Sequence, residues 1–161
     1  MIIISDTSPI INLAVIGRLD ILPKLFGTVV IPKEVFEEIT ANGKDEPGSE
    51  EIRNANWISV QESQNKELIH TLQEVLDQGE SSAIALAIEL NADYLLIDES
   101  LGREYAKEYN VHVMGLIGVL FEAKKQGIVL EVMPIVDSLM NEAGFWISKS
   151  LLNEIHLKDK K

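Results

Sequence analysis

The chain has 161 residues, of which 46% are hydrophobic and 25% charged, a composition typical of a folded globular protein. This length is close to that of one ordinary domain, so we expect residues 1–161 to form a single domain. A formal net charge of -12 argues against a broad positive face for nucleic acid, and the lack of cysteine excludes disulfides, thiolate catalysis and cysteine-type zinc sites.

No apolar run reaches the roughly 20 residues that a membrane-spanning helix needs. The Ile2-Ile3-Ile4 run lacks the basic start and the length of a signal peptide. We therefore expect a cytoplasmic protein with no membrane partner. The acidity commonly serves solubility, but a cation site and attraction for a basic protein partner are a second interpretation.

Short apolar runs alternate with segments of helical periodicity, which is typical of βαβ units and a mainly parallel sheet. Because these runs are continuously apolar, we expect helices on both faces of the sheet. The expected strands are residues 2–5, 28–31, 57–60, 94–97 and 111–114.

Capping residues and apolar periodicity predict the helices. Ser8 before Pro9 resembles an N-cap, and the apolar stripe that follows continues to Gly17. Residues 42–50, rich in turn formers, are expected to form a loop, and Gly79 is expected to interrupt the helical pattern. The other expected helices are residues 19–26, 33–41, 47–55, 64–76, 81–90, 101–109, 117–126, 130–141 and 148–157.

The expected C-terminal helix, residues 148–157, carries an apolar stripe that includes Leu151, Leu152 and Ile155. The stripe could pack on the protein's own core or on a dimer or partner surface. Amphipathic terminal helices usually dock on their own domain, which favours the core.

Four acidic residues stand where strands end or helices begin. Asp6 and Asp98 each follow an apolar strand, Glu80 begins a helical segment, and Glu38 lies in the helix after the second strand. Loops beyond the carboxyl ends of parallel strands share one crevice, so these carboxylates can meet there. Hard divalent cations prefer oxygen ligands, and clustered carboxylates repel one another without one. The pattern therefore predicts a divalent metal site.

Helix capping is the structural alternative to metal binding for three of these acids, and it fits some of them better than others. Asp6 has no obvious capping task, because Ser8 supplies the expected cap. Asp98 could cap the helix that follows it. Glu80 and Asp77 fit a capping box, in which Asp77 is the N-cap.

Glu38 competes with two other acids of the same helix, Glu34 and Glu37. Three acids in five residues usually form a solvated helix face. Glu38 lies near the side that Val35 and Ile39 would bury, which favours it only weakly.

The order and spacing of several motifs resemble the PIN-domain family. The similarity is greatest to its VapC-like prokaryotic toxins, and in particular to the DUF3368 group. It implies an α/β fold, a three-layer α/β/α domain with a mainly parallel sheet. The motifs are Asp6-Thr7-Ser8-Pro9, Ile31-Pro32-x-x-Val35-x-x-Glu38, Gly79-Glu80-Ser81-x-Ala83, Leu95-x-Ile97-Asp98-x-x-x-Gly102-Arg103, Val113-x-Gly115-x-x-Gly118 and Ala143-Gly144-Phe145.

The resemblance implies a metal-dependent endoribonuclease that hydrolyses RNA phosphodiester bonds with Mg²⁺ or Mn²⁺. It further implies the toxin of a toxin–antitoxin pair, with a small antitoxin protein as partner, and it leaves a homodimer open. The implied catalytic residues are Asp6, Glu38, Glu80 and Asp98. Three of these residues, Asp6, Glu80 and Asp98, would bind the metal. Two further residues, Ser8 and Arg103, would contact the RNA.

The chain departs from the family pattern in two places. PIN nucleases often carry an aspartate in place of Glu80, and many carry a further acid after Asp98, where this chain has Gly102 and Arg103. The number of metal ions therefore stays open. The alternative is a catalytically weak or inactive PIN-like scaffold that binds a protein partner or RNA. Arg103 has an alternative of its own, a salt bridge with Glu99.

Two other classes begin with an aspartate at a strand end. A haloacid-dehalogenase-like phosphatase needs a second acid where this chain has Ser8, and a receiver domain needs paired acids and a late lysine. Neither pattern is present.

Overall fold

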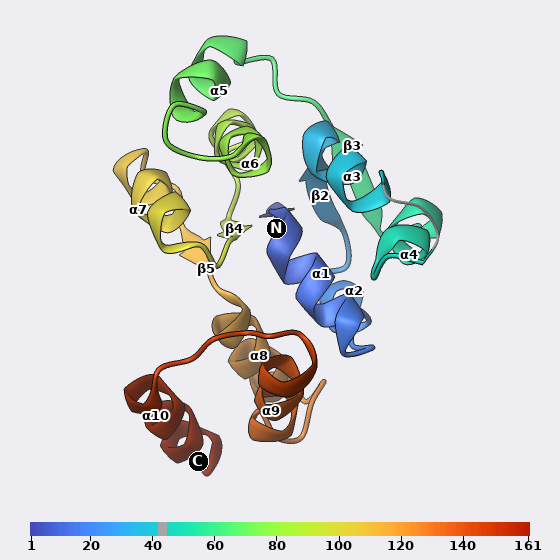
Figure 1. Cartoon of the computed structure of the whole chain (residues 1–161), viewed down its shortest axis with the longest axis vertical. Coiled ribbons are helices and arrows are strands. Elements are labelled where there is room, and N and C mark those ends of the chain that lie inside the picture. The colour runs from blue at the N-terminus through green and yellow to red at the C-terminus, as the bar shows by residue number, and fades with distance from the viewer. Residues whose placement is uncertain (42–44) are drawn as a thin grey trace.

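The computed structural model describes residues 1–41 and 45–161. Its centre is a five-stranded sheet in the order β3-β2-β1-β4-β5, in which every neighbouring pair is parallel (Figure 1). The sheet confirms the α/β fold class expected from the alternating pattern. The strands are β1 (Ile3–Ser5), β2 (Val29–Pro32), β3 (Ile58–Gln61), β4 (Tyr94–Leu96) and β5 (Val113–Met114).

Helices connect the strands and extend the chain beyond the last one. The first five are α1 (Thr7–Val15), α2 (Ile21–Phe26), α3 (Lys33–Thr40), α4 (Ser49–Asn54) and α5 (Lys66–Leu72). The others are α6 (Gln78–Glu89), α7 (Ser100–Glu108), α8 (Leu116–Lys125), α9 (Met133–Glu142) and α10 (Lys149–Asp159). No helix of the described residues is long and apolar enough to cross a membrane.

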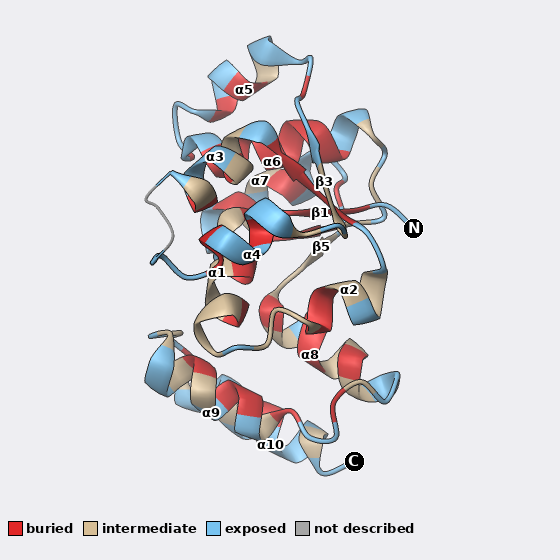
Figure 2. Ribbon diagram, turned by 90° about the vertical axis from the view of Figure 1, so that its right-hand side faces the viewer, coloured by how far each residue is buried: buried red, intermediate tan, exposed pale blue. Residues whose placement is uncertain are grey.

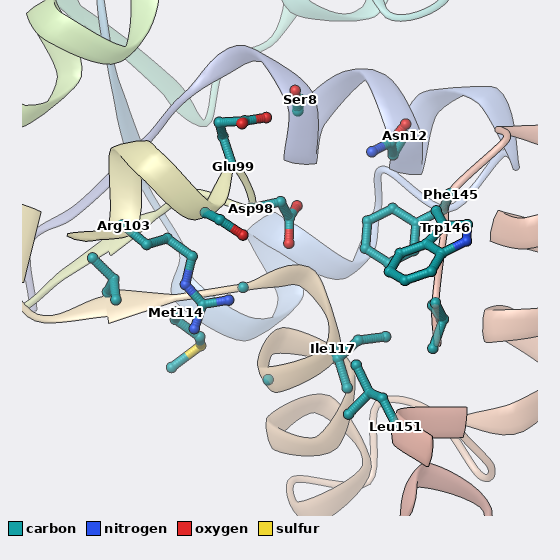
Figure 3. Close-up of a pocket in the computed structure, with 15 residues that line it drawn as sticks. Ser8, Asn12, Asp98, Glu99, Arg103, Met114, Ile117, Phe145, Trp146 and Leu151 are labelled. Atoms are coloured by element: carbon teal, nitrogen blue, oxygen red, sulfur yellow. The ribbon is translucent and has the colours of Figure 1, made fainter. Parts of the chain in front are cut away.

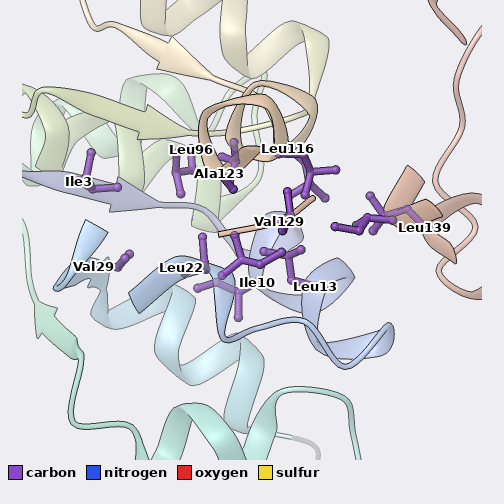
Figure 4. Packing of buried hydrophobic residues seen from close by; sticks show 14 of the residues in the cluster. Ile3, Ile10, Leu13, Leu22, Val29, Leu96, Leu116, Ala123, Val129 and Leu139 are labelled. Carbon is purple, nitrogen blue, oxygen red and sulfur yellow. The ribbon is translucent and has the colours of Figure 1, made fainter. Parts of the chain in front are cut away.

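Successive residues of the central strand β1 point to opposite faces of the sheet, as strand geometry requires. Ile3 packs in one apolar cluster, with side chains from α1, α2 and α8 (Figure 4). Ile4 packs in a second cluster, with side chains from α5, α6 and α7. Both isoleucines are fully buried, each contributing roughly 1.5–3 kcal/mol. Figure 2 shows the whole of β1 as buried. The result is the expected three-layer arrangement.

The last helices lie side by side at the end of the molecule away from α5 (Figures 1 and 2). Ile155 of α10 is buried in the same cluster as Ile3. Asp159 fixes the end of α10, because its carboxylate accepts hydrogen bonds from the Lys124 side chain and from the backbone N–H groups of Val132 and Met133, all at 2.8 Å. These contacts attach α10 to α8 and α9.

Most element boundaries differ from the expected ones by a few residues, but two local predictions were wrong. Gly79 does not interrupt a helix: it lies in the first turn of α6, which begins at Gln78 rather than at 81. Ser8 is not an N-cap, because α1 begins at Thr7 with Asp6 in the cap position. The expected loop over 42–50 falls partly outside the described residues, which omit 42–44.

Candidate functional site

Asp6 lies directly after the central strand of the sheet. Its backbone N–H donates a 3.0 Å hydrogen bond to the Leu96 carbonyl of β4, which fixes the chain at the strand end. Although Asp6 occupies the N-cap position of α1, its carboxylate makes no capping hydrogen bond. Only 5% of the residue is exposed. The carboxylate is thus buried without performing the capping task that this position favours.

The surroundings of Asp6 make its ionised form unfavourable. Burial raises the pKa of Asp6 to about 7; the Thr7 backbone N–H lowers it, and the carboxylates of Asp77, Glu80 and Glu38 raise it further. Asp6 forms no salt bridge with any described residue. A carboxyl that is buried among like charges is stabilised either by a proton or by a cation.

Glu38 reaches Asp6 from α3. Its Oε2 accepts a 2.7 Å hydrogen bond from the Thr7 hydroxyl, so the residue next to Asp6 holds the Glu38 side chain. A Cβ placed on Gly79 would stand 3.0 Å from Glu38 Oε2 and 3.3 Å from Asp6 Oδ1. Only glycine leaves this space to both carboxylates, which gives Gly79 a role in the first turn of α6.

The other two acids of α3 point elsewhere. Glu34 Oε2 accepts a 3.0 Å hydrogen bond from the Ser82 hydroxyl. Glu37 lies 3.9 Å from Lys33 in an exposed ion pair. Among the acids of α3 it is therefore Glu38 that lies beside Asp6. The sequence favoured Glu38 weakly, because it lies near the side of the helix that Val35 and Ile39 bury.

Glu80 combines a structural contact with a free oxygen. The capping box with Asp77 is present: Asp77 Oδ1 accepts from the Glu80 N–H at 2.8 Å, and Glu80 Oε1 accepts from the Asp77 N–H at 3.3 Å. Glu80 Oε2 is buried and has no hydrogen-bond partner. The pKa of Glu80 is raised to about 7, mainly by burial and to a smaller extent by the charge of the Asp77 carboxylate.

Close packing against α7 keeps Glu80 in this place. A Cβ on Gly102 would stand 2.7 Å from Glu80 Oε2 and 2.7 Å from Ile97 Cδ1. Glycine at this position therefore leaves room for the Glu80 carboxylate between α6 and α7.

Asp98 follows β4 but does not cap α7, whose N-cap is Glu99. Its Oδ1 accepts a 2.8 Å hydrogen bond from the N–H of Leu116, the first residue of α8, a favourable place for an anion. Its Oδ2 is buried without a partner. Burial raises the pKa of Asp98, while the Leu116 N–H and the charge of Arg103 lower it.

The four acids are therefore only partly brought together. Asp6 lies beside Glu38 and within the field of Glu80, whereas Asp98 faces the start of α8. Across residues 1–41 and 45–161, no three acidic or histidine side chains are close enough to form a metal-binding group as they stand. Carboxylates repel one another when no cation compensates their charge, so a closer approach is unfavourable without one.

A hollow of about 700 Å³ opens beside Asp98. Figure 3 shows Asp98 and Arg103 on one side of it and Phe145 and Trp146 on the other. The exposed Ser8 contributes to its rim from α1. Arg103 forms no salt bridge with any described residue, so the alternative pairing with Glu99 is wrong. Ser8 and Arg103, both expected to contact substrate, thus line one cavity.

Sequence reasoning missed three residues that shape the site. Thr7 is the donor to Glu38, and Gly79 and Gly102 make room for the acidic side chains. Thr7 stands next to Asp6, and each glycine stands next to or near an acid in the sequence, but only the packing of α6 against α3 and α7 reveals their tasks.

A parallel α/β sheet with acids beyond the carboxyl ends of two neighbouring strands, β1 and β4, is the arrangement of a PIN-like domain. The family model for DUF3368, described as a PIN domain, matches residues 2–160, so the chain belongs to this family of PIN domains. PIN domains are generally nucleases that use divalent metal ions and act on nucleic acid.

A solved structure supports the fold. A PilT N-terminus domain protein from the hyperthermophilic archaeon Sulfolobus solfataricus is similar with a TM-score of 0.58 and 22% identity. The similarity covers 76% of this chain and 93% of that protein. No curated protein matches the chain.

Proposed function

We propose that the protein is a metal-dependent endoribonuclease that hydrolyses RNA phosphodiester bonds. One observation carries the proposal. The Asp6 carboxylate is buried at the end of the central strand, beside Glu38 and Glu80, and has no cationic partner among the described residues. A buried acid in such a place destabilises the ionised protein, so its presence calls for a ligand that compensates the charge.

The donor atoms fit Mg²⁺ or Mn²⁺. Glu80 Oε2 and Asp98 Oδ2 are buried oxygens without hydrogen-bond partners, and hard divalent cations prefer carboxylate oxygens. Asp6, Glu80 and Asp98 would hold the ion, and Glu38 would complete the acidic group. When bound, such an ion polarises the phosphate and lowers the pKa of an attacking water.

The protein's own residues have separate tasks in this mechanism. Thr7 keeps Glu38 directed toward Asp6 through the 2.7 Å hydrogen bond. The Leu116 N–H fixes one oxygen of Asp98 and leaves the other free. Arg103, without a salt bridge among the described residues, would hold a phosphate of the RNA, and Ser8 would contact the chain at the rim of the hollow.

The test is cleavage of an RNA substrate by the purified protein with Mg²⁺ or Mn²⁺ and with a chelator. We expect cleavage with either ion, none with the chelator, and none with Asp6→Asn under any condition. Equal cleavage by wild type and Asp6→Asn would assign the activity to a contaminant or to another site.

A second candidate is an inactive PIN-like scaffold that binds RNA or a protein partner. The net charge of -12 favours it. So does the finding that, among residues 1–41 and 45–161, no three acidic or histidine side chains form a group that could hold a metal ion. Calorimetric titration with Mn²⁺ separates the two functions. The nuclease requires a binding heat that Asp6→Asn removes, whereas the scaffold requires none.

We also propose a cellular role as the toxin of a toxin–antitoxin pair, in which a small antitoxin protein blocks the site. The family resemblance supports this role. Growth arrest on expression, relieved by co-expression of the neighbouring reading frame, is the expected result. The size of the purified protein in solution would show whether it is a homodimer. We further propose that residues 1–161 act as one domain.

A further inference from the structure

Trp146 is the most exposed aromatic side chain on the wall of the hollow beside Asp98. Its exposed fraction is 82%, although tryptophan is among the residues that gain most from burial. Its ring lines the cavity together with Phe145, opposite Arg103 (Figure 3). Tryptophan is enriched at binding interfaces because its ring is apolar and its N–H can donate a hydrogen bond.

The exposure of Trp146 follows from an anchored backbone. Gly144, with φ +68°, ends α9, and the Phe145 N–H donates a 3.0 Å hydrogen bond to the Leu139 carbonyl. On the other side, Ile147 is buried and the Ser148 hydroxyl accepts a 3.1 Å hydrogen bond from Leu151, which caps α10. The segment is thus held at both ends, and the ring is presented outward.

The opposite wall carries groups suited to a phosphodiester chain. A Cβ on Gly115 would stand 3.1 Å from Asp98 Oδ1 and 3.2 Å from Arg103 Nη1, so both side chains flank Gly115 at the start of α8. Arg103 is half-buried and forms no salt bridge with a described residue. Elsewhere on the wall of the hollow, Asn12 of α1 adds an amide, which can donate and accept hydrogen bonds (Figure 3).

We propose that Trp146 is a stacking platform for an unpaired base of single-stranded RNA, with a neighbouring phosphate of the same strand against Arg103. This inference rests on the proposed ribonuclease function and names a residue that would bind the substrate. Single-stranded nucleic acids bind through aromatic stacking of bases and cationic contacts to phosphates. In a duplex the base faces are stacked on one another and offer none to the indole.

The size and chemistry of the hollow favour RNA over a protein occupant. Its volume of about 700 Å³ is that of a pocket for a small ligand, and thus for a short stretch of nucleotides. An apolar peptide would bury the Arg103 guanidinium without giving it a partner, which is costly. A nucleotide supplies a base for the aromatic wall and a phosphate for the guanidinium.

The experiment follows the fluorescence of Trp146 directly. The chain has two tryptophans, so Trp57→Phe leaves Trp146 as the reporter. Short single-stranded oligoribonucleotides are titrated with Ca²⁺ in place of Mg²⁺, and the RNA is checked to be intact afterwards. A blunt-ended RNA duplex of the same composition, which has no loop of unpaired bases, is the comparison. We expect quenching by the single strand and little by the duplex.

Variants separate stacking from a general effect. By anisotropy of a labelled single strand, Trp146→Ala should bind about 5- to 150-fold more weakly, the range for loss of one base–aromatic contact. Trp146→Phe should recover most of this loss because phenylalanine also stacks. Tyr109→Ala is the matched control, since Tyr109 is also an exposed aromatic, 40% accessible, but lies outside the hollow.

Three results would overturn the platform: no binding or quenching by the single strand, equal quenching by the blunt-ended duplex, or equal affinity of Trp146→Ala and wild type. Loss of binding to an antitoxin in Trp146→Ala, with RNA affinity unchanged, would assign the surface to a protein instead. Quenching without cleavage by wild type would retain the platform and remove the nuclease. Cleavage with an unchanged KM in Trp146→Ala would retain the nuclease and remove the platform.

Discussion

Asp6 Oδ1 and Glu38 Oε2 approach the same point on α6, 3.3 and 3.0 Å from the position that a Cβ on Gly79 would occupy. The two acids come from different elements, the end of β1 and the helix α3. The Thr7 hydroxyl holds Glu38 there. A like charge placed beside the buried Asp6 carboxylate indicates that the fold accepts a local cost where a ligand compensates it.

Asp6→Asn should abolish RNA cleavage while leaving the folded protein intact. We expect a loss of at least about 100-fold, because replacing even the hydrogen-bonding partners of metal ligands costs roughly 10- to 100-fold. The free energy of unfolding of the metal-free protein at pH 8 should not fall, since the amide removes a buried like charge. Urea unfolding and a cleavage assay check both, with the exposed Asp137→Asn as control.

Glu38→Gln should lower cleavage strongly, whereas Glu37→Gln should leave it within about twofold. The two acids are neighbours on α3, but only Glu38 stands beside Asp6, and the exposed Glu37 pairs with Lys33. Thr7→Val should reproduce part of the Glu38 effect, roughly 10- to 100-fold, by removing the hydroxyl that orients Glu38. Equal losses in the two glutamine variants would contradict this account of α3.

The stability of the metal-free protein should fall as the pH rises from about 4 to about 7. Asp6 has an ordinary pKa of 3.8 and a folded pKa of about 7, and Glu80 has a folded pKa of about 7 as well. Between these values the folded protein keeps protons that the unfolded chain releases, so stability is lost through this range.

The expected loss is a few kcal/mol, at about 1.4 kcal/mol per pKa unit. Mg²⁺ should restore stability above pH 7, where these acids ionise, and have little effect near pH 4. Thermal unfolding with and without the ion measures this. A stability that rises steadily from pH 4 to pH 7 in metal-free buffer would contradict the assigned burial of Asp6.

Gly102→Ala should displace Glu80 and lower cleavage. The added methyl would stand 2.7 Å from Glu80 Oε2 and from Ile97 Cδ1, and both are ends of side chains that can move. We therefore expect a stability loss of about 1–3 kcal/mol, typical of overpacking. Glu80→Ala makes room for the added methyl group. In that background, Gly102→Ala should lower the free energy of unfolding clearly less. Additive losses would show that Glu80 is not the group displaced.

Asp159→Asn should destabilise the protein without changing the acidic site. Although burial raises the pKa of Asp159, hydrogen bonds from Lys124, Val132 and Met133 lower it overall. The charged form therefore stabilises the fold above its ordinary pKa, and this contribution is lost as the pH falls. We expect about 1.5–3 kcal/mol at pH 7 from chemical denaturation. A double-mutant cycle with Lys124→Met should show coupling between the two residues.

The sheet and its layers could be predicted from the sequence because each strand is a short apolar run between helical segments. Local details needed the structure. Ser8 before Pro9 is a strong capping signal, yet α1 begins one residue earlier, after Asp6. Gly79 resembles a helix breaker, but helix α6 tolerates it because the missing side chain makes room for Glu38 and Asp6.

The acids of the site could be identified from strand ends, but their partners could not. The hydrogen bond from Leu116 to Asp98 joins residues 18 apart and depends on how α8 enters the fold. Trp146 was assigned no functional role from the sequence, although it directly follows the Ala143-Gly144-Phe145 motif. Its outward position results from the turn at Gly144 and the anchoring of Ile147, which composition and periodicity do not encode.

Anomalous diffraction from crystals soaked in Mn²⁺ tests the central claim most directly. If the acids form a cation site, a manganese peak will lie within coordination distance of the carboxylates of Asp6 and Asp98, and it will be missing in Asp6→Asn crystals soaked in the same way. A wild-type crystal that shows no peak near these residues at saturating Mn²⁺ would contradict the assignment of a metal-dependent nuclease.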